Sequence, residues 1–207
     1  MQNETVSIPS YNIADIQDQA GTLDFFMKTA FQKMEKVAPA KIVSYDRQTN
    51  RAVIQILNYS VTSVGDKAER KPLSDIPVAV FGAGNFCFSL PVKEDDIGII
   101  VSCDGDISIW KKILNKFTPA TEQKHRYKDG IFFPLIINNF TFAQDDENSL
   151  LLSSTDGATK ISIAENKISI QAADVEITGK LTINNQEYVS HTHSNGNGGA
   201  PTGGVII

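Results

Sequence analysis

The chain has 207 residues, 41% of them apolar and 21% charged, and its net charge is -5. This length allows one or two domains with a buried core, and the composition is too apolar for a disordered chain. The acidic balance, without a run of Lys or Arg, argues against a nucleic-acid partner. The first residues lack the basic and apolar segments of a secretory signal, and no apolar run approaches about 18 residues. We therefore expect a protein made in a cytoplasm, without a membrane-spanning helix.

Residues 1–37 are predicted to contain one short amphipathic helix. Its apolar side chains recur three or four residues apart, as an exposed helix with one apolar face requires; they are Leu23, Phe26, Met27, Ala30, Phe31 and Met34. Thr22 is placed to cap the start of this helix, and Pro39 stops the pattern beyond its end. Its polar face carries both charges, whereas a membrane-binding helix has a basic one. We expect the stripe to pack on the following domain or on a copy of itself.

Residues 38–140 are predicted to form a small β-domain. Five short apolar segments are separated by turns rich in Gly, Asp and Asn, which is typical of a compact barrel or sandwich. These predicted strands are 41–46, 51–57, 76–82, 86–92 and 97–106. Cys87 and Cys103 lack metal-ligand spacing, and we expect two buried free thiols on neighbouring strands rather than a disulfide.

From about residue 150 the chain carries a short repeat. Two aliphatic residues flank one other residue in each unit: Ile161 and Ile163, Ile168 and Ile170, Val175 and Ile177, and Leu181 and Ile183. The first members lie 7, 7 and 6 residues apart, with polar turns between the units. Such units are too short to be the hairpins of an ordinary sheet, and one chain cannot bury two apolar side chains per unit.

Three chains wound about a common axis would bury these residues. We therefore predict a triple-stranded β-helix at 141–189, with the isoleucines inward and with Lys160, Ser162, Ser169 and Glu176 outward. The alternative is an additional sheet packed on the preceding domain, which would leave the regular period unexplained.

A His-x-His motif follows the repeat, at His191 and His193. In an extended strand the two imidazoles point to the same side. Three chains that share an axis would bring six such nitrogens together, and six neutral imidazoles suit an octahedral first-row divalent ion such as iron, whereas structural zinc takes four ligands. The following Gly-rich segment fits a tightly wound tip, so residues 190–207 are predicted to form a metal-bound apex.

No catalytic constellation is visible in the sequence, and we predict that the protein is not an enzyme. Asp104 and Asp106 resemble part of a calcium loop, but the remaining ligands of that motif are missing. His125 lies between two basic residues, with no nucleophile signature beside it. A turn is the preferred interpretation of the segment from Asp104 to Asp106.

Several segments together resemble the central spike proteins of contractile-tailed phages, which are also called baseplate assembly protein V or membrane-piercing proteins. The specific segments are LPVKEDDIGIIVSCDGDISIW at 90–110, HRYKDGIFFP at 125–134 and SHTHSNGNGGAPTGGV at 190–205. The resemblance covers roughly residues 39–207. It implies an OB-fold domain at 38–140, followed by the intertwined triple-stranded β-helix and its apex.

The resemblance also implies partners and a metal. It implies a homotrimer that holds one iron ion through His191 and His193 of all three chains, and OB domains that dock on a baseplate hub or tail tube protein. Some relatives insert a lysozyme domain between barrel and helix, but about ten residues separate the two here. The expected role is therefore mechanical piercing of the host outer membrane from the distal tip of a virion baseplate, with no nucleic acid and no small-molecule substrate.

Three other interpretations stay open at the level of sequence. A carbohydrate-binding or depolymerising tail protein would need aromatic-lined grooves and carboxylate pairs, of which the repeat offers little. A receptor-binding fibre tip would bind cells stably before contraction. The spike of a bacteriocin or related injection machine would share the same parts.

Overall fold

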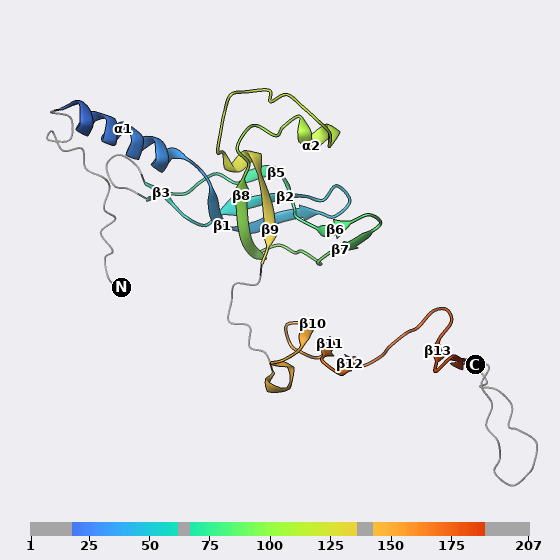
Figure 1. Cartoon of the computed structure of the whole chain (residues 1–207). Helices are drawn as coiled ribbons and strands as arrows, with labels where there is room; N and C mark the ends of the chain where they lie inside the picture. Colours follow the sequence, from blue (N-terminus) through green and yellow to red (C-terminus); the bar gives the residue numbers. More distant parts are fainter. Residues whose placement is uncertain (1–17, 62–66, 136–142, 189–207) are drawn as a thin grey trace, which may run out of the picture. The chain divides into compact units, whose positions relative to one another are not determined.

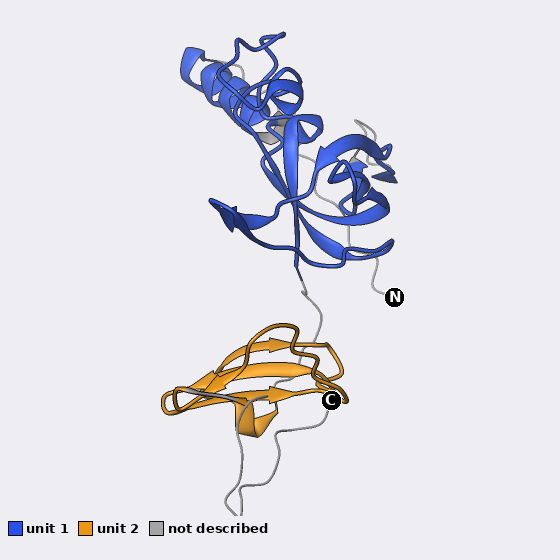
Figure 2. Ribbon diagram, turned by 90° about the vertical axis from the view of Figure 1, so that its right-hand side faces the viewer, with its two compact units in different colours: residues 1–139 blue, residues 140–207 orange. Residues whose placement is uncertain are grey.

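A computed structural model describes residues 18–61, 67–135 and 143–188. The chain divides into two compact units, residues 1–139 and residues 140–207 (Figures 1 and 2). The described residues are mostly β-sheet with a single helix longer than four residues, which confirms the predicted all-β class. Among these residues, no helix is both long and apolar enough to cross a membrane.

The N-terminal helix α1 spans Gln19–Lys33. Its cap is Asp18, whose carboxylate accepts a hydrogen bond from the Gly21 N–H at 2.6 Å. The prediction of Thr22 as the cap is wrong: Thr22 lies inside the first turn, and its hydroxyl donates to the Asp18 carbonyl. A carboxylate one residue before the helix satisfies a free N–H that the helix itself cannot pair, so Asp18 is the better start signal.

Five antiparallel strands form the main sheet of unit 1, in the order β5-β2-β1-β8-β9. They are β1 (Val37–Asp46), β2 (Arg51–Ile56), β5 (Leu73–Pro77), β8 (Ile97–Ser102) and β9 (Gly130–Pro134). The sheet curls until its two edges meet, because Val78, just after β5, forms a parallel bridge with Phe132 of β9. The Ala79 N–H donates to the Phe132 carbonyl at 2.7 Å. The result is the small, partly closed barrel that the sequence predicts.

Two predicted barrel strands differ from the structure. The predicted strand 76–82 contains only the last two residues of β5 and runs past its end. Residues 86–92 do not enter the main sheet. The fifth strand of that sheet is β9, a segment that was not among the predicted strands. Phe86–Phe88 instead forms β7, which pairs with β6 (Phe81–Ala83) in a separate hairpin. Both segments are short and apolar, so composition alone does not show which one joins the sheet.

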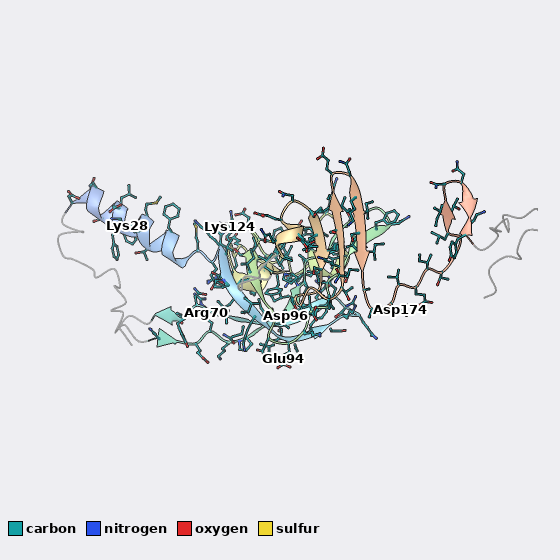
Figure 3. The ribbon with its side chains drawn as sticks, turned by 90° about the horizontal axis from the view of Figure 1, so that it is seen from below. Lys28, Arg70, Glu94, Asp96, Lys124 and Asp174 are labelled. Atoms are coloured by element: carbon teal, nitrogen blue, oxygen red, sulfur yellow. The ribbon has the colours of Figure 1, made fainter. Side chains whose placement is uncertain are left out.

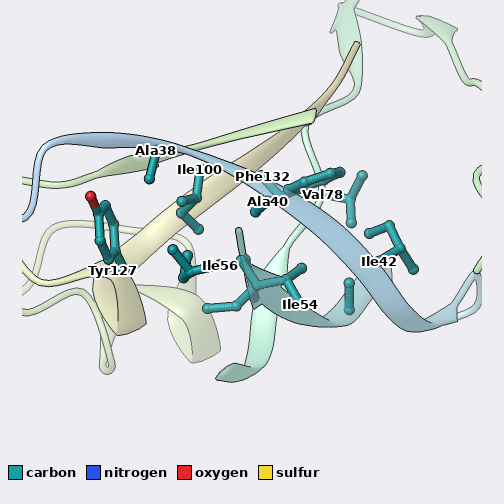
Figure 4. Close-up of a cluster of buried hydrophobic side chains, with 11 residues drawn as sticks. Ala38, Ala40, Ile42, Ile54, Ile56, Val78, Ile100, Tyr127 and Phe132 are labelled. Atoms are coloured by element: carbon teal, nitrogen blue, oxygen red, sulfur yellow. The ribbon is translucent and has the colours of Figure 1, made fainter. Parts of the chain in front are cut away.

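The core of unit 1 fills the barrel, as Figure 4 shows. Alternate residues of β1, β2 and β8 are buried, as expected for strands with one face on the core. The fully buried side chains of largest volume are Phe132, Ile42, Ile54, Ile76 and Ile100. Gly98 lets β8 and β9 approach closely, because a Cβ there would lie 2.2 Å from the Phe133 carbonyl oxygen. The barrel therefore completes its core within one chain.

Smaller elements complete unit 1. They are the hairpin of β3 (Ser60–Val61) and β4 (Lys67–Ala68), the short helix α2 (Trp110–Ile113) and the 3-10 turn η2 (Tyr127–Asp129). Cys87 and Cys103 are both free, as predicted. They are not two buried residues on neighbouring strands, however, since Cys87 is exposed on the β6–β7 hairpin and Cys103 is half-buried beyond the end of β8.

Unit 2 contains a three-stranded antiparallel sheet, β10-β11-β12, and a small hairpin. Its elements are η3 (Gln144–Asp146), β10 (Leu150–Ser153), β11 (Lys160–Ala164), β12 (Lys167–Gln171), β13 (Thr182–Ile183) and β14 (Gln186–Glu187). The expectation that these strands are too short to pair as hairpins within one chain is wrong. A two-residue turn at Glu165 and Asn166 suffices to pair β11 with β12.

Candidate functional site

One face of the β10–β12 sheet carries a ladder of aliphatic side chains. Strand register aligns Leu150 with Ile163 and Ile168, and it aligns Leu152 with Ile161 and Ile170. Residues that are paired directly, or that lie two apart on one strand, share a face. All six are exposed in the single chain, from 40% for Ile161 to 72% for Leu150. We call this surface the aliphatic face: Leu150, Leu152, Ile161, Ile163, Ile168 and Ile170.

The opposite face of the same sheet is polar and better covered. Ser162 is buried there, and Lys160 forms an ion pair with the buried Asp146 of η3 at 2.6 Å. Lys160, Ser162 and Ser169 thus lie opposite the isoleucines, as predicted. A folded chain normally covers its apolar face rather than its polar one. The aliphatic face is therefore unsatisfied in a single copy.

The remaining predicted repeat units differ from the first two. Val175 and Ile177 are exposed and lie outside any strand, and of the last unit Ile183 lies in β13 while Leu181 precedes it. Two β-branched residues in isolation offer too little apolar surface to hold a strand in one chain. The intertwined triple-stranded β-helix expected for this region needs three chains and stays a prediction.

A second exposed apolar surface lies on unit 1. The β6–β7 hairpin pairs Phe81 with Phe88 and Ala83 with Phe86, which places three Phe rings on one face. Phe86 is 86% exposed, and the other two rings are also exposed. Gly84 suits the turn, because glycine adopts its φ of +59° without the steric cost that a Cβ brings. We call the surface of Phe81, Phe86 and Phe88 the aromatic hairpin.

A polar clamp joins the end of α1 to the barrel. The Glu35 carboxylate accepts hydrogen bonds from Arg70 Nη1 and from the Tyr127 N–H, both at 2.8 Å. The Glu35 backbone carbonyl accepts from the Ser102 hydroxyl, and its N–H donates to the His125 carbonyl. Arg70, labelled in Figure 3, also lies over the Tyr127 ring at 5.5 Å. Residues far apart in sequence thus meet at Glu35.

Two buried carboxyl groups have pKa values displaced in opposite directions. Hydrogen bonds from Ser108 and Thr121 lower the pKa of Asp106 to about 2, whereas burial raises the pKa of Asp129. Such a pair is typical of acid–base sites. Here each carboxylate has a structural partner, since Asp106 accepts from the Ser108 N–H at 2.8 Å and Asp129 accepts from the Ile107 N–H at 3.3 Å. The pair fastens the loop after β8. The predicted turn at Asp104 and Asp106 is not formed: Asp104 lies at a bend, and Gly105 between the two forms an isolated bridge with Lys124.

The predicted metal ligands His191 and His193 lie outside the described residues. Within the described ranges, no group of three or more His, Cys, Asp or Glu side chains is placed to hold an ion. The third histidine, His125, has Nε2 at 3.2 Å from the Asp104 carboxylate, with Asp104 exposed to solvent. This contact belongs to a surface loop.

Three features of the described residues were not predicted from the sequence. Leu150 and Leu152 show the apolar-x-apolar pattern of the repeat, but they precede the next unit by 11 rather than 7 residues. The aromatic hairpin was read as part of the barrel, although its Phe-x-Phe segment directly follows a Gly-Asn turn. Glu35 carried no signal, because its partners lie 35 and 92 residues away.

One comparison with known protein families gives a match, and it covers the barrel. Residues 38–134 match the family model described as phage protein Gp138 N-terminal domain, a match that runs from β1 to the end of β9. A search of curated proteins gives no match. The family match supports a phage tail-associated, virion-associated protein, and this confirms the coarser part of the resemblance seen in the sequence.

Proposed function

We propose that this protein is the trimeric central spike of a contractile injection machine, and that it pierces the host outer membrane mechanically from the distal tip of the baseplate. The aliphatic face carries the proposal. An exposed, contiguous apolar surface of this kind marks a site that another molecule covers. The family match supports a phage tail or baseplate role for the barrel that precedes it.

Three copies give the aliphatic face a partner of its own kind. Each copy contributes one apolar side, and three sides around a common axis make a closed prism with polar outer faces. The strand edges of β10 and β12 would then meet neighbouring copies instead of solvent, so fewer backbone groups stay unpaired. A closed prism with hydrogen bonds between its strands carries axial load without bending, which is what a piercing spike needs.

The apex is proposed to hold one iron ion. His191 and His193 of three chains supply six imidazoles, and the ion would crosslink a Gly-rich segment that has few apolar side chains of its own. Elemental analysis of the purified protein should find one iron per three chains, and the double change His191→Ala and His193→Ala should abolish it. A purified trimer without a transition metal would refute this part of the proposal.

The aromatic hairpin is proposed as the surface that docks unit 1 on the baseplate hub. Three exposed Phe rings on one face form the kind of anchor that dominates protein interfaces. Phe86→Ser should leave the trimer intact but yield particles without the spike. Cys87→Ser is the matched control, because Cys87 lies on the opposite face of the same strand. Particles that incorporate both variants equally would exclude this surface.

Sedimentation of the full chain tests the proposed function directly. We expect a stable trimer at micromolar concentration, and a monomer would contradict the shared core. A depolymerase would instead release sugar from isolated cell-surface polysaccharide, and a mechanical spike should release none. An adhesion assay with intact cells separates the spike from a receptor-binding fibre tip, which would bind them stably.

A further inference from the structure

The helix α1 exposes its apolar stripe to solvent in the single chain. Leu23, Phe26, Met27 and Phe31 are all exposed, although each is large and apolar. An isolated helix of about 15 residues is only marginally stable in water, and helices in proteins are held by burial of their apolar face. The stripe therefore needs a partner that the single copy does not supply.

The spacing of the stripe matches a coiled-coil heptad. Ala20, Leu23, Met27 and Ala30 occupy successive a and d positions of α1. Phe26 and Phe31 flank them at g and e. In a parallel bundle the g residue of one helix lies beside the e residue of the next heptad on its neighbour, so Phe26 of one copy would meet Phe31 of another. The pattern is thus complementary to itself.

The width of the stripe distinguishes three helices from two. At 3.6 residues per turn, the arc from Phe26 to Phe31 spans about 140° of the helix surface. A two-stranded coiled coil buries a narrower a and d seam, whereas each helix of a larger bundle also buries flanking positions. Lys28 lies outside this arc, where it forms an ion pair with Asp24, and it is labelled on α1 in Figure 3.

We propose that α1 packs its stripe against the same stripes of two other copies, in a parallel three-helix bundle at the N-terminal end of the protein. This inference rests on the proposed trimer. Rotational symmetry places equivalent residues of three chains at the same height, which is the register that the heptad requires. Joining three helices in one trimer raises their effective concentration to about the millimolar range, so a short bundle can form.

The clamp at Glu35 fixes the base of α1 to the barrel, so three symmetric barrels would hold three α1 helices in equivalent positions. Only residues 34–36 separate the end of α1 from the start of β1. Glu35 within this connection is bonded to Arg70, Tyr127 and Ser102, so the base of the helix is fixed to unit 1. Symmetric barrels therefore present symmetric helices.

Single cysteines introduced in the full chain test the bundle. The background carries Cys87→Ser and Cys103→Ser, because both native thiols are free. Leu23→Cys places a thiol at a d position, and Lys28→Cys places one on the outer face as the matched control. After mild oxidation and full denaturation, we expect at least a tenfold higher yield of disulfide-linked dimers for Leu23→Cys. Ala30→Cys, a second d position, should behave like Leu23→Cys.

Sedimentation of the same reduced samples separates the two proposals. A trimer whose Leu23→Cys and Lys28→Cys variants crosslink equally would overturn the bundle and leave the spike intact. A monomer would overturn the proposed function itself. A Leu23→Cys thiol that is labelled freely in the trimer, and protected only in assembled particles, would overturn the bundle by assigning the stripe to a baseplate protein.

Discussion

Replacing Ile168 by Asp is the sharpest test of the shared aliphatic core. Ile168 pairs with Ile163 across β11 and β12, and it is 69% exposed in the single chain. The folding of one copy should therefore tolerate the change, and its effect should fall on assembly. Gln171→Asp introduces the same charge into the same strand, on the opposite and exposed side.

The magnitude follows from the burial that assembly would add. Full burial of an isoleucine side chain contributes about 1.5–3 kcal/mol, so covering the exposed two thirds of Ile168 contributes about 1–2 kcal/mol per copy. Over three copies the loss is about 3–6 kcal/mol, and each buried carboxylate adds a desolvation cost of several kcal/mol. A total on the order of 10 kcal/mol lowers the assembly constant by about seven powers of ten.

Sedimentation at micromolar protein is the assay, with circular dichroism to verify that unit 1 stays folded. Ile168→Asp should sediment as a monomer and Gln171→Asp as a trimer. Ile168→Ala should form a trimer that dissociates at a lower denaturant concentration than the unmodified protein. If Ile168→Asp and Gln171→Asp form equally stable trimers, the aliphatic face does not line a shared axis and the reasoning fails.

Three further changes probe unit 1. Glu35→Ala leaves the half-buried Arg70 without its carboxylate and should lower the free energy of unfolding of unit 1 by about 2–4 kcal/mol in urea; a loss below about 0.5 kcal/mol would mean that the clamp is not stabilising. Gly98→Ala forces β8 away from β9 and should lower the free energy of unfolding of unit 1 by about 1–3 kcal/mol. Gly105→Ala is the control: a Cβ there meets open space, so the free energy of unfolding should hardly change. The folded-state pKa of Asp106 is lowered from 3.8 to about 2, so its contribution to stability is present above pH 3.8 and is lost as the pH falls through about 2. Asp106→Asn should therefore flatten the stability profile between these values, and an unchanged acid limb would contradict the assignment.

The features that depend on nearby residues were predictable from the sequence. The alternation of buried residues in β1 and β2 and the spacing of the α1 stripe depend on neighbours a few residues apart. All three elements form close to where they were expected. The opposite faces of Ile161 and Ser162 follow from strand geometry alone. The local periodicity of apolar residues was therefore the main basis on which the fold class could be predicted.

The features that depend on distant contacts were not predictable in the same way. Residues 86–92 and 130–134 are similarly apolar, and only closure of the sheet through Val78 and Phe132 decides which segment joins the barrel. Glu35 meets partners from three other parts of unit 1. The helix cap shifted from Thr22 to Asp18 because several polar residues near the start compete for the same free N–H groups.

The two units differ in how far one copy can complete its own packing, and this difference orders the assembly. Phe132 and Ile42 are fully buried, so the barrel of unit 1 completes its core within one copy. The β10–β12 sheet of unit 2 has an ion pair to η3 on its polar face, while its aliphatic face is exposed. If the proposed trimer forms, the stability of unit 2 should depend on the concentration of other copies. In the proposed trimer, the barrel would fold first and the exposed leucines and isoleucines would then find their partners. The proposed assembly therefore runs from a folded barrel to a spike.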